Sequence, residues 1–220
     1  MNSTRIKVCC ISSIEEAKLA TRYGANAIGL VGPMPSGPGP IEIELINEIA
    51  RSAAPSVSTF LLTCETSAKG IIDIYKKTHT HVLQLVDAVE NMEVYTKVRE
   101  ALPHVKVVQV IHVTGPESLD EALIIAPHVD GLLLDSGNPK LAVKELGGTG
   151  RVHDWSVSKA IVEESGVPVF LAGGLNPDNV REAIEKVRPF GVDVCSGLRK
   201  NGGLEEDLLY DFVSAVRKES

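Results

Sequence analysis

Two side chains near the start of the chain have the types and spacing suited to proton transfer. The segment "RIKVCCISSIEEA" places Lys7 and Cys9 two residues apart at the end of an apolar run. Residues two apart lie on the same face of a β-strand, so Lys7 and Cys9 share one face and Cys10 takes the other. A nearby ammonium favours the thiolate form of a cysteine. Cys9 is therefore a candidate base or, alternatively, a small buried hydrophobe, and Cys10 is expected to contribute only packing.

A carboxylate at the end of another apolar run is the second candidate for chemistry. Asp135 closes the segment "GLLLD". A carboxylate is rarely tolerated inside so apolar a strand, so we expect Asp135 to emerge at the strand's end, where it can serve as a general acid. The alternative is a structural carboxylate that accepts hydrogen bonds from the "SGN" turn that follows.

Three glycine-rich segments late in the chain are suited to holding a phosphate. They are "GGTG" at 147–150, "AGG" at 172–174 and "SG" at 196–197. Backbone N–H groups in such loops can approach an anion closely, although any one of these segments alone is more often an ordinary turn. Their combination predicts a phosphate site, with Asp193 either orienting it or pairing locally. The predicted phosphate residues are Gly148, Gly150, Gly173, Gly174, Ser196 and Gly197.

The remaining metal-ligand types do not form a pattern. The six histidines have no HExxH-like spacing, and Cys9, Cys10, Cys64 and Cys195 have no paired CxxC spacing. We therefore expect no metal site and four reduced thiols.

The elements that must position these residues alternate between short apolar runs and longer amphipathic segments, the pattern of βαβ units. Strands are predicted at 5–10, 26–31, 56–62, 81–85, 105–111, 130–135, 167–172 and 191–194, and helices near 13, 42, 67, 90, 116, 154, 176 and 204. Eight repeats predict a (β/α)8 TIM barrel, as one domain over residues 1–220, with its site at the carboxyl ends of the strands. An open doubly wound sheet competes, but it usually has a glycine-rich turn after its first strand, and this strand ends in cysteine.

The composition limits the kinds of ligand and partner that the chain is expected to bind. The 220 residues, 44% of them hydrophobic, can bury one substantial core, and the net charge of -7 argues against a nucleic-acid or membrane-surface partner. The chain has neither a signal-peptide pattern nor an apolar run of roughly 18 residues. We expect a cytoplasmic monomer or homodimer that binds a small molecule.

These segments together resemble the phosphoribosylanthranilate isomerase family of tryptophan biosynthesis, whose members are (β/α)8 barrels. The likeness runs nearly end to end and is strongest in "GGTGRVHDWS", "LAGGLNPDNVREAI" and "VRPFGVDVCSG", which look like that family's phosphate loops. "KVC" and "LLLDS" resemble the segments that carry its general base and its general acid. The resemblance implies those roles for Cys9 and Asp135, and we place Lys7 and Gln84 with the substrate-binding residues.

The reaction implied by the resemblance is an Amadori rearrangement of a phosphosugar that needs no cofactor. Asp135 would protonate the ring oxygen of an N-phosphoribosyl arylamine as the furanose opens to an iminium. The Cys9 thiolate would then remove the C2 proton, and the resulting enolamine would tautomerise to a 1-amino-1-deoxyribulose phosphate. Holding the phosphate fixed positions both ends of one ribose for these transfers.

Three segments depart from the family pattern. "KVCC" places Cys10 where the family has glycine, "PSGPGPIE" lacks an arginine suited to the anthranilate carboxylate, and "QLVDAVE" replaces the usual "QLHG" while keeping Gln84. Three hypotheses follow: phosphoribosylanthranilate isomerase, a paralogue acting on another phosphoribosyl amine, and a phosphosugar-binding barrel without turnover. The presence of both Cys9 and Asp135 disfavours the last, because a binding protein needs no acid and base around one ligand.

Overall fold

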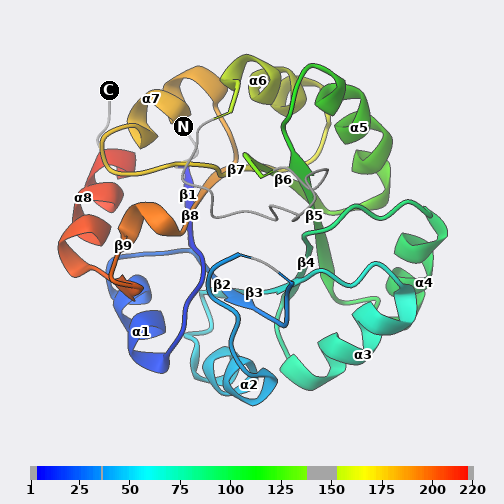
Figure 1. Ribbon diagram of the computed structural model, residues 1–220, viewed down its shortest axis with the longest axis horizontal. Helices are drawn as coiled ribbons and strands as arrows, with labels where there is room; N and C mark the ends of the chain where they lie inside the picture. The colour runs from blue at the N-terminus through cyan, green and yellow to red at the C-terminus, as the bar shows by residue number, and fades with distance from the viewer. Residues whose placement is uncertain (1–3, 36, 138–152, 218–220) are drawn as a thin grey trace.

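The protein is a closed barrel of eight parallel strands inside a ring of helices, as the computed structural model shows (Figure 1). The structure describes residues 4–35, 37–137 and 153–217. The barrel strands are β1 (Arg5–Val8), β2 (Ala27–Val31), β3 (Ser58–Thr63), β4 (Val82–Leu85), β5 (Lys106–His112), β6 (Gly131–Asp135), β7 (Val169–Leu171) and β8 (Gly191–Val194). Each strand pairs with its neighbours in chain order, and β8 closes on β1. The predicted (β/α)8 barrel is confirmed, and the open sheet is excluded.

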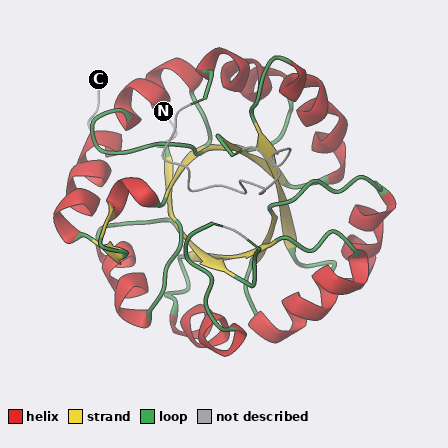
Figure 2. Ribbon diagram, viewed as in Figure 1, coloured by secondary structure: helices red, strands yellow, loops and turns green. Residues whose placement is uncertain are grey.

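The helices form the outer layer (Figure 2). They are α1 (Ile14–Arg22), α2 (Ile43–Ser52), α3 (Ala68–Thr78), α4 (Glu93–Ala101), α5 (Glu117–Ile125), α6 (Trp155–Glu164), α7 (Val180–Val187) and α8 (Glu206–Arg217). A short 3-10 helix, η1 (Ala126–His128), extends α5. Within the described residues, no helix is both long and apolar enough to cross a membrane.

Five helices begin one residue after the predicted position, and polar side chains cap three of them, α1, α3 and α6. Ser13 Oγ accepts from the Glu16 N–H at 3.1 Å, and Ser67 caps α3 in the same way. The helix α4 begins later, at Glu93, after a turn in which Asn91 Oδ1 accepts from the Glu93 N–H. These side chains satisfy donors that a helix start leaves unpaired.

The last two helices also begin later than predicted. Before α7, Asn176 Oδ1 accepts from the Asp178 N–H at 2.9 Å, so residues 176–179 form a turn. Before α8, the chain makes an unpredicted 3-10 turn, η2 (Ser196–Leu198), and a hairpin of β9 (Arg199–Lys200) and β10 (Gly203–Leu204). Asn201 and Gly202 have φ of 52° and 85°, the left-handed conformation that a two-residue hairpin turn requires.

Alternation along the strands divides the buried residues into two cores. In β5, Val107 and Ile111 face the helices, whereas Val108 and Val110 fill the inside of the barrel. Strand residues point alternately to the two sides, so this separation follows from the sequence. The inward-facing side chains nearest the carboxyl ends of the strands line the pocket.

Candidate active site

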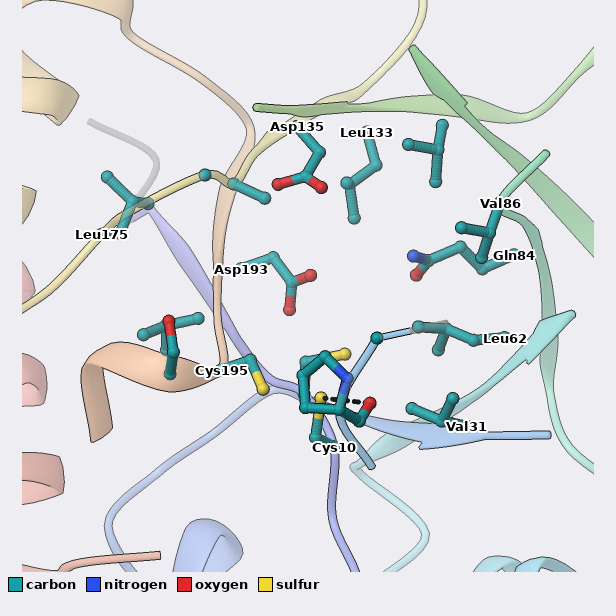
Figure 3. A pocket seen from close by; sticks show the side chains of 18 of the residues that line it. Cys10, Val31, Leu62, Gln84, Val86, Leu133, Asp135, Leu175, Asp193 and Cys195 are labelled. Carbon is teal, nitrogen blue, oxygen red and sulfur yellow. Dashed lines mark hydrogen bonds between the residues drawn. The ribbon is translucent and has the colours of Figure 1, made fainter. Parts of the chain in front are cut away.

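The pocket lies at the carboxyl ends of the barrel strands, where a (β/α)8 barrel places its functional groups. Cys9, Asp135 and Gln84, predicted from separate segments, all line it. Figure 3 shows the carboxylates of Asp135 and Asp193 and the amide of Gln84 turned into the same space. The fold therefore brings the candidate acid and the candidate base into one pocket.

Cys9 follows the last residue of β1, and its thiol lies against Gly29 of β2. Its backbone N–H donates to the Val194 carbonyl at 2.8 Å, which fixes the residue against β8. A Cβ added to Gly29 would lie 2.7 Å from Cys9 Sγ and 3.1 Å from Lys7 Nζ. Gly29 thus leaves the space that both side chains occupy, and the predicted common face of Lys7 and Cys9 is confirmed.

Lys7 lies beneath the pocket and is not among the residues that line it. Its Nζ is 2.9 Å from Asp193 Oδ1 and 5.3 Å from the centroid of the Phe60 ring, and its side chain has no exposed surface. Burial alone would lower the pKa of Lys7, but the Asp193 carboxylate together with Cys9 and Cys10 outweighs burial and raises it. Burial raises the pKa of Asp193, and Lys7 offsets part of that rise. The ion pair therefore lies at the bottom of the pocket, where Asp193 is a lining residue and Lys7 lies behind it.

Asp135 is 6% exposed and lines the pocket from the end of β6. Burial raises the pKa of its carboxyl group, against the opposing effects of His112 and of hydrogen bonds from the Ser136 and Gly137 N–H groups. The two interpretations of Asp135 are therefore compatible, because one carboxyl group faces the pocket and also accepts from the following turn. A raised pKa favours the protonated form that a general acid needs.

Three of the predicted phosphate residues meet on one side of the pocket. Gly173 and Gly174, at φ of 82° and 64°, line it together with Ser196. Gly197 does not line it and packs instead against the backbone of Leu175, where a side chain would collide with the carbonyl oxygen. The other two predicted residues, Gly148 and Gly150, lie outside the described residues.

The predicted orientation of Cys10 is wrong. Strand β1 ends at Val8, and Cys10 has a left-handed φ of 60°, so the alternation of a strand no longer applies. Cys10 lines the pocket, as does Cys195 after β8. Figure 3 draws the sulfur atoms of these two residues beside each other, with the hydrogen bond from Cys10 to the Pro38 carbonyl oxygen as a dashed line.

Arg199 is a residue of the site region that sequence reasoning missed. Its Nη2 donates to the Cys10 carbonyl oxygen at 2.6 Å and to Glu16 Oε2 at 2.9 Å. It thereby ties the loop after β1 to the hairpin after β8. The Asn-Gly pair in "RKNGGL" is the signal that could have placed this hairpin, and Arg199 with it.

The side of the pocket away from the glycines is apolar. Val31, Met34, Leu62 and Val86 line it, and in the part of the chain that the structure describes no lysine or arginine side chain joins them. An aromatic ring can be buried against such side chains. A carboxylate on that ring would have no cationic partner among these residues.

Comparisons with known proteins agree with this arrangement. Residues 6–215 match the family model of N-(5'-phosphoribosyl)anthranilate (PRA) isomerase. N-(5'-phosphoribosyl)anthranilate isomerase 2 of Methanosarcina mazei is 36% identical over 98% of this chain and 95% of its own length. The corresponding isomerase of Haloferax volcanii is 34% identical over 97% of this chain and 93% of its own length.

Solved structures lead to the same family. Phosphoribosyl anthranilate isomerase from Thermotoga maritima superposes with a TM-score of 0.83 at 29% identity, covering 97% of this chain and 98% of that one. Such an isomerase in complex with reduced 1-(o-carboxyphenylamino)-1-deoxyribulose 5-phosphate gives a TM-score of 0.80 at 27% identity, with the same coverage. The chain belongs to the N-(5'-phosphoribosyl)anthranilate isomerase family.

Proposed function

We propose that the protein converts N-(5'-phosphoribosyl)anthranilate to 1-(2-carboxyphenylamino)-1-deoxyribulose 5-phosphate, with Asp135 as the general acid and Cys9 as the general base. The observation that carries this proposal is that both side chains line one pocket from β6 and β1, two strands that are not neighbours. A ribose held between them presents its ring oxygen to one group and its C2 proton to the other.

The phosphate is the group that fixes the ribose in this proposal. Gly173 and Gly174 supply a loop in which no side chain separates the backbone from the ligand, and Ser196 adds a hydroxyl from η2. Loops after the last two strands of such barrels are common phosphate sites. Gly197 supports this side by allowing close packing against Leu175.

Asp135 acts in the first step. Its buried carboxyl group transfers a proton to the furanose ring oxygen as the bond from that oxygen to C1 breaks, and the amine nitrogen lone pair forms the iminium. Burial supports this role because it raises the pKa of Asp135.

Cys9 acts in the second step. Its thiolate takes the C2 proton, the electrons of that bond form the enolamine, and the iminium nitrogen regains its lone pair. Lys7 is buried beside the thiol, and its Nζ and Cys9 Sγ both lie next to Gly29. The enolamine then tautomerises to the ketose, so every step is a proton transfer.

A second candidate substrate is a phosphoribosyl amine whose aryl group has no carboxylate. It is favoured by the apolar lining of Val31, Met34, Leu62 and Val86 and by the lack of a lining cation among the described residues. Losing a charge-assisted partner for a carboxylate costs about 1.5–3 kcal/mol.

The test is to follow consumption of N-(5'-phosphoribosyl)anthranilate by its fluorescence after adding the purified protein, in parallel with phosphoribosylaniline assayed by product. Fast consumption of the anthranilate compound supports the main proposal. Turnover of the aniline compound alone favours the second candidate, and turnover of neither contradicts both.

We further propose that residues 1–220 act as one barrel domain in the cytoplasm, as a monomer or a homodimer, without a nucleic-acid or membrane partner. The four cysteines are free thiols, which supports a reducing compartment. One solved relative, from Thermotoga maritima, is described as monomers generated from a dimeric enzyme. Light scattering on the purified chain distinguishes the two oligomeric states.

A further inference from the structure

Cys10 and Cys195 lie together at the pocket, on the loops that follow β1 and β8. Val8 pairs with Val194 in the barrel, so the two loops leave neighbouring strands side by side. Figure 3 draws the two sulfur atoms beside each other at the pocket, and each thiol shifts the pKa of the other. The isomerisation proposed above uses neither thiol.

The environment assigns the proton of this pair to Cys10. Cys10 Sγ lies 3.7 Å from the Pro38 carbonyl oxygen, which can only accept, so the sulfur there carries a hydrogen. The neighbouring Cys195 and Cys9 thiols, together with burial, raise the pKa of Cys10. Cys10 is therefore the protonated member of the pair.

Cys195 has the opposite character. The neighbouring Cys10 thiol lowers the pKa of Cys195, and the Arg199 guanidinium adds to this against burial and the Asp193 charge. The residue is also partly exposed, whereas Cys10 is buried. A thiolate-prone and accessible sulfur beside a protonated thiol is the arrangement of a redox-sensitive pair.

We propose that Cys195 and Cys10 form a modification site for oxidants of the peroxide class, in which Cys195 reacts first and Cys10 then closes a reversible disulfide across the pocket.

The chemistry balances with one peroxide. The Cys195 thiolate attacks one peroxide oxygen, the O–O bond breaks, and the sulfur becomes a sulfenic acid while the leaving hydroxide is protonated to water. The Cys10 sulfur then attacks the Cys195 sulfur, the S–O bond breaks, and the hydroxyl leaves as water with the Cys10 proton. Two thiols lose two electrons, and one hydrogen peroxide becomes two waters. A dithiol reverses the step by exchange.

The disulfide would connect the loop that carries Cys9 to the loop that carries Ser196. Both Cys10 and Cys195 line the pocket, so the bond would cross space that the ligand needs. We expect oxidation to inhibit turnover and a dithiol to restore it. This consequence rests on the proposed function, whereas formation of the disulfide does not.

The experiment treats the purified full chain with hydrogen peroxide, alkylates the remaining thiols, and maps linked peptides by fragmentation mass spectrometry without reduction. The expected product is a Cys10–Cys195 link that dithiothreitol removes. The Cys195→Ser and Cys10→Ser variants should both lose it, and Cys10→Ser should instead accumulate sulfinic acid at Cys195. Cys9→Ser should retain the link, as should Cys64→Ser, which removes a partly exposed thiol on a different loop.

The outcomes separate the two claims. An absent link, a link through Cys9 or Cys64, or a link that persists in Cys195→Ser overturns the proposed site. A Cys10–Cys195 link that leaves the turnover of an active preparation unchanged overturns the proposed inhibition. If the reduced protein has no turnover at all, the proposed function fails, while the link is still scored by mass.

Discussion

The ammonium of Lys7 and the carboxylate of Asp193 are 2.9 Å apart inside the barrel, with side chains 0% and 7% exposed. Lys7 comes from β1 and Asp193 from β8, and the register of these strands places the two residues opposite each other. The ion pair therefore joins the first and last strands at the point where the barrel closes.

Removing one partner of this pair should be costly. Lys7→Met leaves the Asp193 carboxylate buried without its cation, and we expect a loss of about 3–5 kcal/mol in the free energy of unfolding. Urea denaturation of the variant measures it. The matched control is Lys97→Met, which removes the exposed pair with Glu93 and should cost about 0.5 kcal/mol or less. Equal losses in the two variants would show that burial of the Lys7 pair does not matter.

The Gly29→Ala substitution should damage activity through the position of Cys9. The new Cβ would lie 2.7 Å from Cys9 Sγ, so the thiol must move, and a displacement of about 1 Å can cost about 10²-fold in rate. We expect kcat to fall by about that factor. Gly203→Ala is the control, because its added Cβ meets nothing closer than the Lys200 carbonyl oxygen at 3.7 Å. An unchanged kcat in Gly29→Ala would mean that the thiol position is not critical.

The planar guanidinium of Arg199, and not only its positive charge, should be needed for stability. Its guanidinium donates to Glu16 and to the Cys10 carbonyl at the same time, which an ammonium cannot reproduce in this geometry. We expect Arg199→Lys to lower the free energy of unfolding by about 2 kcal/mol and to raise KM more than it lowers kcat. An unchanged free energy of unfolding in Arg199→Lys would refute a structural role for the guanidinium.

The buried carboxyl group of Asp135 should make stability depend on pH. Its folded pKa is raised above the ordinary value of 3.8, so the protonated form favours folding and this contribution is lost as pH rises through the folded pKa. Asn cannot ionise, so Asp135→Asn should gain stability relative to the original chain between pH 3 and neutrality. Urea denaturation across this range measures the difference. A difference that is constant or shrinks with rising pH would contradict the raised pKa.

The sequence predicted those features that depend on regular alternation. Lys7 and Cys9 share a face because they lie in or next to a strand, and Ser13 and Ser67 start helices because their side chains cap them. Asp135 emerges at the pocket because it ends an apolar strand.

Irregular backbone explains what the sequence did not predict. Alternation along β1 failed at Cys10, because this residue lies two positions after the strand, and its left-handed backbone turns the side chain back to the pocket. The contact of Arg199 with the loop after β1 is a long-range contact made by a short hairpin, and no local periodicity reports it. The pairing of Cys10 with Cys195 needs the closure of β1 on β8, which only the complete barrel supplies.

The measurement that tests the central claim most directly is the rate of phosphoribosylanthranilate fluorescence loss with the purified protein and with its Cys9→Ala and Asp135→Asn variants. If the two residues are the base and the acid, the original chain turns over and each variant loses at least about 10²-fold in kcat while remaining folded. Turnover that survives unchanged in either folded variant would contradict the assignment of that residue.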